Sequence, residues 1–383
     1  MILFLVSTVL VLLFHPSKAT TTLYGTVCVE QTLWPISVNE KTGAQTRLGS
    51  VGAPREAQAQ GYSCANANVL FVLGYNENTT KANLVGFDIK DGSVKYDVPS
   101  LPFIESAFVG VGQQIACDLQ EVVVVGHDNT NGSHHVLAYN PDTQVTRSVV
   151  QIPGSNIGIL GGTSTIDTKR GILYALFASN NTKTKQIQID MYAVSIRKGQ
   201  DMGKFEIVPT DNAVGHNFGA MKYDAQLDAV VGFASDPKTN RRQVMTMAGA
   251  PLGTPRTWKA IGDVVGFEME DGAIIAIDGT NNVMYAIIQP SPTGPQSYVN
   301  ASGAACASCA KDSFCCRDPT QPQDQGACYT HECSMIPTGS GGLNTSEPFR
   351  LVTMDLAAKA TVISSPPLCT LKAGDCPWQL DML

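Results

Sequence analysis

The chain repeats one strand pattern at intervals of about fifty residues. Each repeat has an apolar stretch that ends at a polar turn, a second apolar stretch, a polar loop and two further strand-like segments. In four repeats an aspartate follows the first stretch, 49 to 57 residues after the previous one: Asp118, Asp167, Asp224 and Asp278. A fixed repeat indicates stacked supersecondary units, so this feature constrains the fold most strongly.

The second apolar stretches are nearly continuous runs rich in Val, Ile and Leu, and five of them lie at Val69–Tyr75, Glu121–His127, Ile172–Ala178, Ala229–Ala234 and Val283–Ile288. Runs of this kind are typical of strands that are covered on both faces. The segments after them, such as "NLVGFDIKDGSV", alternate apolar with polar residues and then meet turn residues. Helical stripes are absent, so the sequence predicts an all-β protein.

This plan resembles the secreted six-bladed β-propellers, in which four-stranded sheets stand around a central axis. The resemblance covers the repeat region and predicts a single β-propeller of six four-stranded blades, or seven if two units are merged in this reading. The leading segment "TLYGTVCVEQTLWPISVNEKTGAQTRLG" supplies only three strands. We expect the C-terminal segment "LCTLKAGDCPWQL" to supply the missing innermost strand, because an open ring would leave an exposed sheet edge.

The N-terminus predicts export from the cell. An apolar run from Ile2 to Phe14 is followed by Pro16 and by Ser17-Lys18-Ala19, which fit a signal-peptidase site. The run is shorter than the roughly 20 residues that span a bilayer, which disfavours the alternative of an uncleaved anchor. We therefore expect a signal peptide at 1–19 and a secreted propeller at 20–383, with no membrane span.

Glycosylation motifs agree with export. The N-x-S/T motif places an acceptor in an exposed loop of a secreted protein. Five asparagines have it: Asn78, Asn131, Asn180, Asn300 and Asn344. The first three are expected in the loops between second and third strands of successive blades, and the other two in the corresponding loop of the last blade.

A cysteine-rich cassette interrupts the last blade. We interpret 289–347 as an insertion between its second and third strands. Its six cysteines are Cys306, Cys309, Cys315, Cys316, Cys328 and Cys333. The alternative is a tetrahedral zinc site formed by Cys306, Cys309, Cys328 and Cys333 with His331 nearby. Thiols of secreted proteins are oxidised, so we expect three disulfides within the cassette instead.

Five cysteines lie outside the cassette. Cys64 and Cys117 end the innermost strands of adjacent blades. We expect them either to be buried free thiols or to form a disulfide between the two blades. We expect Cys28 to pair with Cys369 or Cys376 and so to lock the ring closure. Because this count is odd, at least one of the five is unpaired or pairs with another chain.

Polar residues enter the innermost strands at the expected central mouth: Glu56, Glu105, Asn156, His216, Glu268 and Glu270. Carboxylates with Asn and His suit a hard cation such as Ca²⁺. The set resembles the six-bladed lactonase and arylesterase propellers, in which a central calcium polarises an ester oxygen. The alternative is that these are ordinary loop residues. His134 and His135, which open a third strand, are expected at the surface.

Composition limits the class of partner. A net charge of −7 and a pI near 5.4 give no basic footprint for nucleic acid. No GxSxG or HExxH motif identifies a catalytic residue. The leading hypothesis is a secreted glycoprotein that acts as an extracellular binding scaffold for protein or glycan, without a cofactor. The alternative is a Ca²⁺-dependent propeller hydrolase with its site at the mouth.

Overall fold

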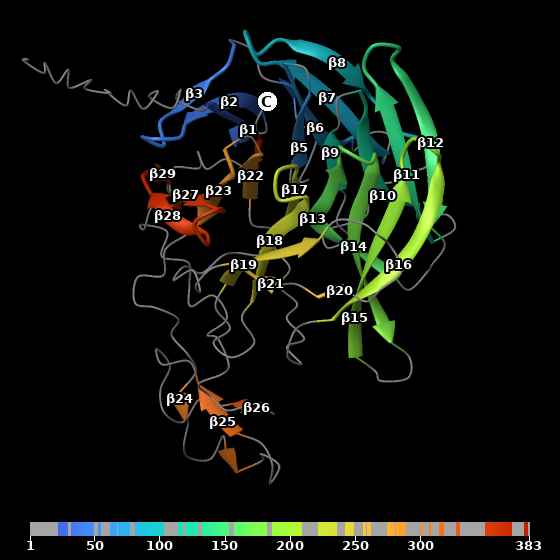
Figure 1. The fold of residues 1–383 in the computed structure, drawn as a ribbon. Coiled ribbons are helices and arrows are strands. Elements are labelled where there is room, and N and C mark those ends of the chain that lie inside the picture. The colour runs from blue at the N-terminus through green and yellow to red at the C-terminus, as the bar shows by residue number, and fades with distance from the viewer. Residues whose placement is uncertain are drawn as a thin grey trace, which may run out of the picture.

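A computed structural model shows an all-β chain, as the sequence predicts (Figure 1). The regular elements in the described part of the chain are all strands. The described residues include no helix that is long and apolar enough to cross a membrane. The structure describes residues 22–29, 32–49, 53–54, 62–66, 68–76, 81–102, 114–117, 120–128, 132–152, 157–181, 186–208, 221–235, 242–248, 256–257, 259–261, 274–279, 281–288, 299–300, 306–307, 314–317, 327–329, 349–369 and 379–381.

The repeats fold into antiparallel sheets of four strands, each formed from strands that follow one another in the chain. The first three repeats give β5 to β8 (Tyr62–Asn66, Val69–Asn76, Lys81–Asp88, Val94–Val98), β9 to β12 (Gln114–Cys117, Val122–Asp128, Ser133–Asn140, Val145–Ile152) and β13 to β16 (Ile157–Asp167, Ile172–Asn181, Gln186–Ser195, Gln200–Val208). The next two give β17, β18, β19 and β21 (Met221–Asp224, Ala229–Ser235, Arg242–Ala248, Lys259–Ala260), then β22, β23, β27 and β28 (Ile274–Asp278, Val283–Ile288, Phe349–Asp355, Thr361–Ser364).

Two short strands extend these sheets. β20 (Arg256–Thr257) pairs in parallel with the end of β16, and β29 (Pro367–Cys369) pairs with β27.

Strands from both ends of the chain share the remaining large sheet. It holds β1 (Thr22–Val29), β2 (Thr32–Asn39), β3 (Gln45–Arg47), β4 (Ala53–Pro54) and β30 (Gln379–Asp381). β30 pairs antiparallel with β1, with Leu380 opposite Gly25. The C-terminal strand therefore completes the sheet in which the sequence had only three of the expected four strands.

Apolar cores lie between consecutive sheets, which explains why the second strands are apolar along their whole length. Each core takes side chains from two sheets, and representative pairs are Phe71 with Leu137, Val125 with Phe177, Tyr174 with Val230, Phe233 with Met284, Tyr285 with Leu23, and Phe87 with Tyr24. The first strands contact one another in the order β5, β9, β13, β17, β22 and β30, and β30 contacts β5. Sheets stacked radially through their faces in this way form a β-propeller.

A small separate sheet interrupts the last repeat. β24 (Val299–Asn300), β25 (Phe314–Arg317) and β26 (Ala327–Tyr329) pair only with one another among the described strands. Figure 1 draws them apart from the other sheets. β23 and β27, on either side of this segment in the chain, pair directly, with Ile288 opposite Arg350. The chain therefore leaves the sheet after β23 and returns to it at β27.

Candidate functional site

The residues predicted to line a central mouth all lie outside the described residues: Glu56, Glu105, Asn156, His216, Glu268 and Glu270. The calcium site therefore stays a prediction. Within the described part of the chain no group of three or more His, Cys, Asp or Glu residues could hold a metal ion.

The predicted glycosylation sites are only partly described. Asn78, Asn131 and Asn344 lie outside the described residues. Asn180 lies within β14, where it pairs with Ile187, and not in the loop after that strand as expected. The strand continues past Ala178 because the β14–β15 hairpin keeps its register as far as Asn181 and Gln186. Asn300 lies in β24, opposite Cys316.

Disulfides join cysteines in two parts of the molecule. Cys64 and Cys117, at the first strands of neighbouring sheets, are bonded with an S–S distance of 1.98 Å, so the bridge and not the pair of thiols is present. Cys306 is bonded to Cys315 at 2.08 Å, a pair internal to the cassette. Cys369 is also disulfide-bonded. The expected pairing within the rest of the cassette, which includes Cys309, Cys316, Cys328 and Cys333, stays a prediction, as do the roles of Cys28 and Cys376.

The histidines predicted at the surface are buried. His134 is 0% exposed, and its ring lies 4.8 Å from that of His127 and 5.2 Å from that of Phe177 in the next sheet. His135 is also buried. The prediction was wrong because β11 is covered on both faces by neighbouring sheets, so its alternate residues have no solvent side.

A serine, a histidine and an aspartate meet at this hairpin, but their geometry is not that of an acyl-transfer triad. Ser133 Oγ lies 3.2 Å and Asp128 Oδ2 lies 3.4 Å from the same nitrogen, Nε2 of His135. In a triad the serine and the aspartate contact opposite ring nitrogens, so that the aspartate orients the imidazole while the other nitrogen takes the proton of the serine. Ser133 Oγ also accepts a hydrogen bond from Gln151 Nε2 at 2.8 Å. The cluster therefore ties β10, β11 and β12 together.

The best-defined polar surface is the one formed by the turns between first and second strands and between third and fourth strands. We call it the turn face. Antiparallel order places both kinds of turn at the same end of every sheet. Three of the four turn aspartates that the repeat predicted lie in this face: Asp167 and Asp224 are fully buried, and Asp278 is nearly so. Asp118 lies outside the described residues.

These aspartates hold the turns by accepting backbone hydrogen bonds. Asp224 Oδ1 accepts from the amides of Gln226 and Leu227 at 2.8 and 3.0 Å. Asp167 and Asp278 make the corresponding bond to the amides of Arg170 and Asn281, both at 3.0 Å. Side-chain bonds of this kind stabilise the turn conformation and give at least one oxygen of each buried carboxylate a hydrogen-bond donor.

A second bond fixes each pair of turns to each other. The residue that closes the first turn has positive φ in four of the described sheets: Asn68, Gly171, Asp228 and Asn282. The carbonyls of Asn68, Gly171 and Asn282 accept the amide of the residue after the third strand, which is Ile89, Ile196 or Leu356, at 2.8 to 3.1 Å. A left-handed residue suits Gly and Asn best, which explains the residue types found there.

One arginine links two neighbouring sheets across the turn face. Arg170 donates to both carboxylate oxygens of Asp228 at 2.6 and 2.7 Å, and to Asp167 Oδ2 at 2.7 Å. Tyr223 donates to Asp228 Oδ1 at 2.5 Å. The hydrogen bonds from Arg170 first, and from Tyr223 second, hold the pKa of Asp228 well below its usual range. Burial, followed by the bond to Asp228, raises the pKa of Tyr223 above its usual range.

Other cross-sheet bonds follow the same plan around the face. Arg147 makes a bidentate pair with Glu121 at 2.7 and 2.9 Å and also donates to the carbonyl of Ile196 in the next sheet at 3.1 Å. Asn282 Nδ2 donates to Gln226 Oε1 at 2.6 Å. The turn face is therefore a set of turns fixed to one another and to their neighbours.

No motif in the sequence marks these arginines. An aspartate followed four positions later by Gly, Asp or Asn, as in 167–171, 224–228 and 278–282, was a usable signal for the turns. The ion-pair partners could not be found in this way, because Arg170 and Asp228 come from different repeats.

Comparisons with known proteins give likeness in fold only. No protein-family profile matches the chain, and no curated protein matches it in sequence. A chain of a nidogen/laminin complex is 9% identical, with 95% of this chain and 98% of that chain covered and a TM-score of 0.36. The β-propeller domain of the Trilobed protease from Pyrococcus furiosus is 9% identical, over 81% and 83% of the two chains, with a TM-score of 0.37. The WD40 domain of Toxoplasma gondii coronin is 9% identical, over 71% and 63%, with a TM-score of 0.38.

Proposed function

We propose that this protein is a secreted, disulfide-stabilised scaffold that presents its turn face to an extracellular partner. The ring is a closed propeller of six blades in this proposal, with β30 as the innermost strand of the first blade. The cyclic contacts of the first strands and the pairing of β30 with β1 support the closure.

Disulfides support a location outside the reducing cytosol. Cys64–Cys117 joins two blades, and Cys306–Cys315 lies in the small sheet region between β23 and β27. Structural disulfides persist mainly in secreted and extracellular proteins. The apolar segment at 2–14 and the five glycosylation motifs agree with this location.

The rigidity of the turn face is the observation that carries the proposal. Binding costs less entropy when the contacting side chains and loops are ordered before the partner arrives. On the turn face, buried aspartates, left-handed residues and cross-sheet ion pairs order the turns in advance. In the sequence, the motifs at Asn78 and Asn131 fall between second and third strands. Connections between second and third strands lie at the end of each sheet opposite the turn face, so glycans there would leave the turn face accessible.

The test is to express the full chain with its own N-terminal segment and to analyse the protein that reaches the medium. We expect a chain that begins at Thr20 and holds no stoichiometric metal. It should show no hydrolysis of aryl esters or lactones above background when calcium is added. Retention in the cell would contradict the secreted scaffold. Calcium-dependent hydrolysis that a substitution at Glu56 or Glu268 abolishes would replace it with the hydrolase.

A further inference from the structure

Basic side chains concentrate on the turn face of the β13–β16 sheet. Lys169, Arg197 and Lys198 are exposed there, and we call these three residues the basic patch. They come from two turns of one sheet, and the amide of Ile196 donates to the carbonyl of Gly171 at 3.0 Å. The patch is notable because the whole chain carries a net charge of −7.

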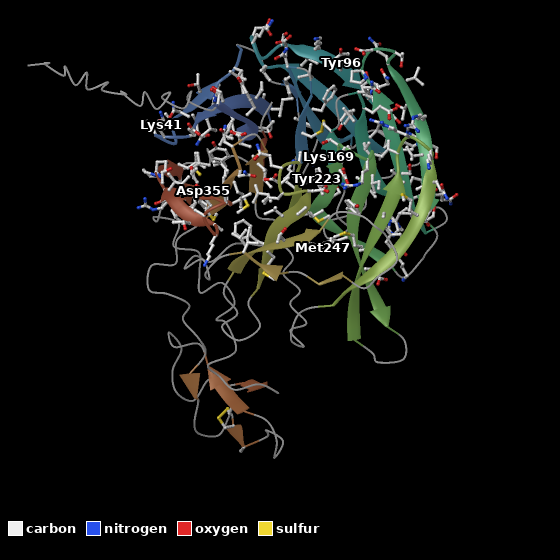
Figure 2. The ribbon with its side chains drawn as sticks, in the orientation of Figure 1. Lys41, Tyr96, Lys169, Tyr223, Met247 and Asp355 are labelled. Atoms are coloured by element: carbon white, nitrogen blue, oxygen red, sulfur yellow. A yellow bond between two sulfur atoms is a disulfide. The ribbon has the colours of Figure 1, made fainter. Side chains whose placement is uncertain are left out.

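The turn that carries Arg197 and Lys198 packs against the turn that carries Lys169. Arg197 lies over Gly171, so close that a β-carbon at position 171 would be 3.1 Å from its Nε. Lys169 contributes to the lowered pKa of Asp228, which places its ammonium near the carboxylate that Arg170 binds. Figure 2 labels Lys169 together with Tyr223, whose hydroxyl lies 3.4 Å from Arg170 Nη1.

The carboxylates around the patch are already engaged by two other arginines. Glu121 binds Arg147, and Asp167 and Asp228 bind Arg170. In the described part of the chain none of the three patch residues has an ion-pair partner. The nearest exposed acid along the chain, Asp201, accepts a hydrogen bond from the amide of Gly203 at 2.8 Å. In the described part of the chain, therefore, no ion pair neutralises the positive charge of the patch.

The character of the exposed side chains indicates the class of partner. The exposed residues at 168–170 and 197–200 are charged, polar or glycine, without an aromatic or large aliphatic side chain. Among the described residues, the exposed large apolar residues nearest along the chain are Met202 and Val145. Protein interfaces are usually anchored by aromatic and apolar side chains at their centre. Exposed Lys and Arg clusters without such anchors suit a polyanion bound by charge, as heparin is.

We propose that the basic patch binds an acidic extracellular polysaccharide through its sulfate or carboxylate groups. The guanidinium of Arg197 offers paired donors to one anionic group, and the ammonium groups of Lys169 and Lys198 engage its neighbours. Arg170 and Arg147 hold the turns below the patch and do not themselves contact the polymer. This inference rests on the proposed secretion, because such polymers lie outside the cell.

The test uses the purified full chain and measures binding of heparin fragments and of polygalacturonate fragments in 0.1 M NaCl. The two probes distinguish a sulfated source from a carboxylated one. The test variant is K169Q/R197Q/K198Q. The control is K41Q/K90Q/K359Q, which removes the same charge from exposed turn residues of the same face in other sheets. Lys41 is drawn well away from Lys169 in Figure 2.

We expect the wild type to bind at least one of the two probes. The patch variant should lose about tenfold or more in affinity, and the slope of log affinity against log salt should fall by roughly 2 to 3, because each lost cation releases about one fewer counterion. The control should change affinity less than about threefold, since it alters only the distant field. Circular dichroism should show both variants folded.

Three results would overturn the proposal. The first is that the wild type binds neither polysaccharide. The second is that both variants lose affinity equally, which would mean that net charge alone was measured. The third is that poly-glutamate binds more tightly than either polysaccharide, which would make an acidic protein the partner. Each result leaves secretion intact, because secretion is measured on the medium and not by binding.

Discussion

The substitution R170Q tests whether one residue holds two sheets together. It removes the cation that contacts Asp167 and Asp228 but keeps a side chain of similar reach. The backbone bond from residue 170 to Asp167 and the bond from Tyr223 to Asp228 both remain available. The expected loss of stability is therefore that of the charged contacts alone.

The magnitude follows from exposure. The side chains of Arg170 and Asp228 are 34% and 42% exposed, so solvent screens their pairing and it contributes only about 0.2 to 1 kcal/mol. The side chain of Asp167 is 0% exposed, and losing a hydrogen bond from a charged donor to a buried group costs about 1.5 to 3 kcal/mol. We expect R170Q to lower the free energy of unfolding by about 2 to 3 kcal/mol. K169Q, at the adjacent exposed position, should change it by less than about 0.5 kcal/mol.

The assay is urea unfolding at a series of pH values. The pKa of Asp228 is lower in the folded protein than in the unfolded chain, so its contribution is present above pH 4 and is lost as pH falls below about 4. The difference between wild type and R170Q should therefore be largest at neutral pH and should narrow below pH 4. A difference under about 0.5 kcal/mol at pH 7, or one that does not narrow in acid, would refute the reasoning.

Two further predictions concern the disulfides. Cys64–Cys117 closes a loop with a sequence separation of 53, so C64A/C117A should lower the free energy of unfolding by about 4 kcal/mol in the chain-entropy account. Calorimetry under oxidising conditions measures this change. An unchanged thermal transition would mean that the bridge does not form. C306S/C315S should leave the main thermal transition within about 1 °C of the wild type. The reason is that these residues belong to a segment whose strands pair with none of the other described strands. Cooperative loss of the whole fold in this variant would contradict that independence.

The sequence predicts the sheets better than it predicts what joins them. Second strands such as β6 and β23 begin where expected, because a strand covered on both faces needs an unbroken apolar run. β10 runs from Val122 to Asp128, one residue later than expected. The turn aspartates are also read from sequence, because each acts on amides only two or three residues away.

Contacts between repeats could not be predicted in the same way. Arg170 and Asp228 are 58 residues apart, and their pairing depends on how two sheets pack. His134 was misplaced for a related reason. The alternation in β7 reflects partial exposure, with intermediate and buried residues taking turns, whereas β11 is buried along nearly its whole length. Single-strand patterns do not distinguish these two environments.

Non-reducing peptide mapping of the protein from the medium tests the central claim most directly. The account of a secreted propeller scaffold predicts an N-terminal peptide that begins at Thr20, a peptide pair joined through Cys64 and Cys117, and glycosylated peptides containing Asn78 and Asn131. A chain that retains Met1, with free thiols at Cys64 and Cys117 and unmodified asparagines, would contradict it.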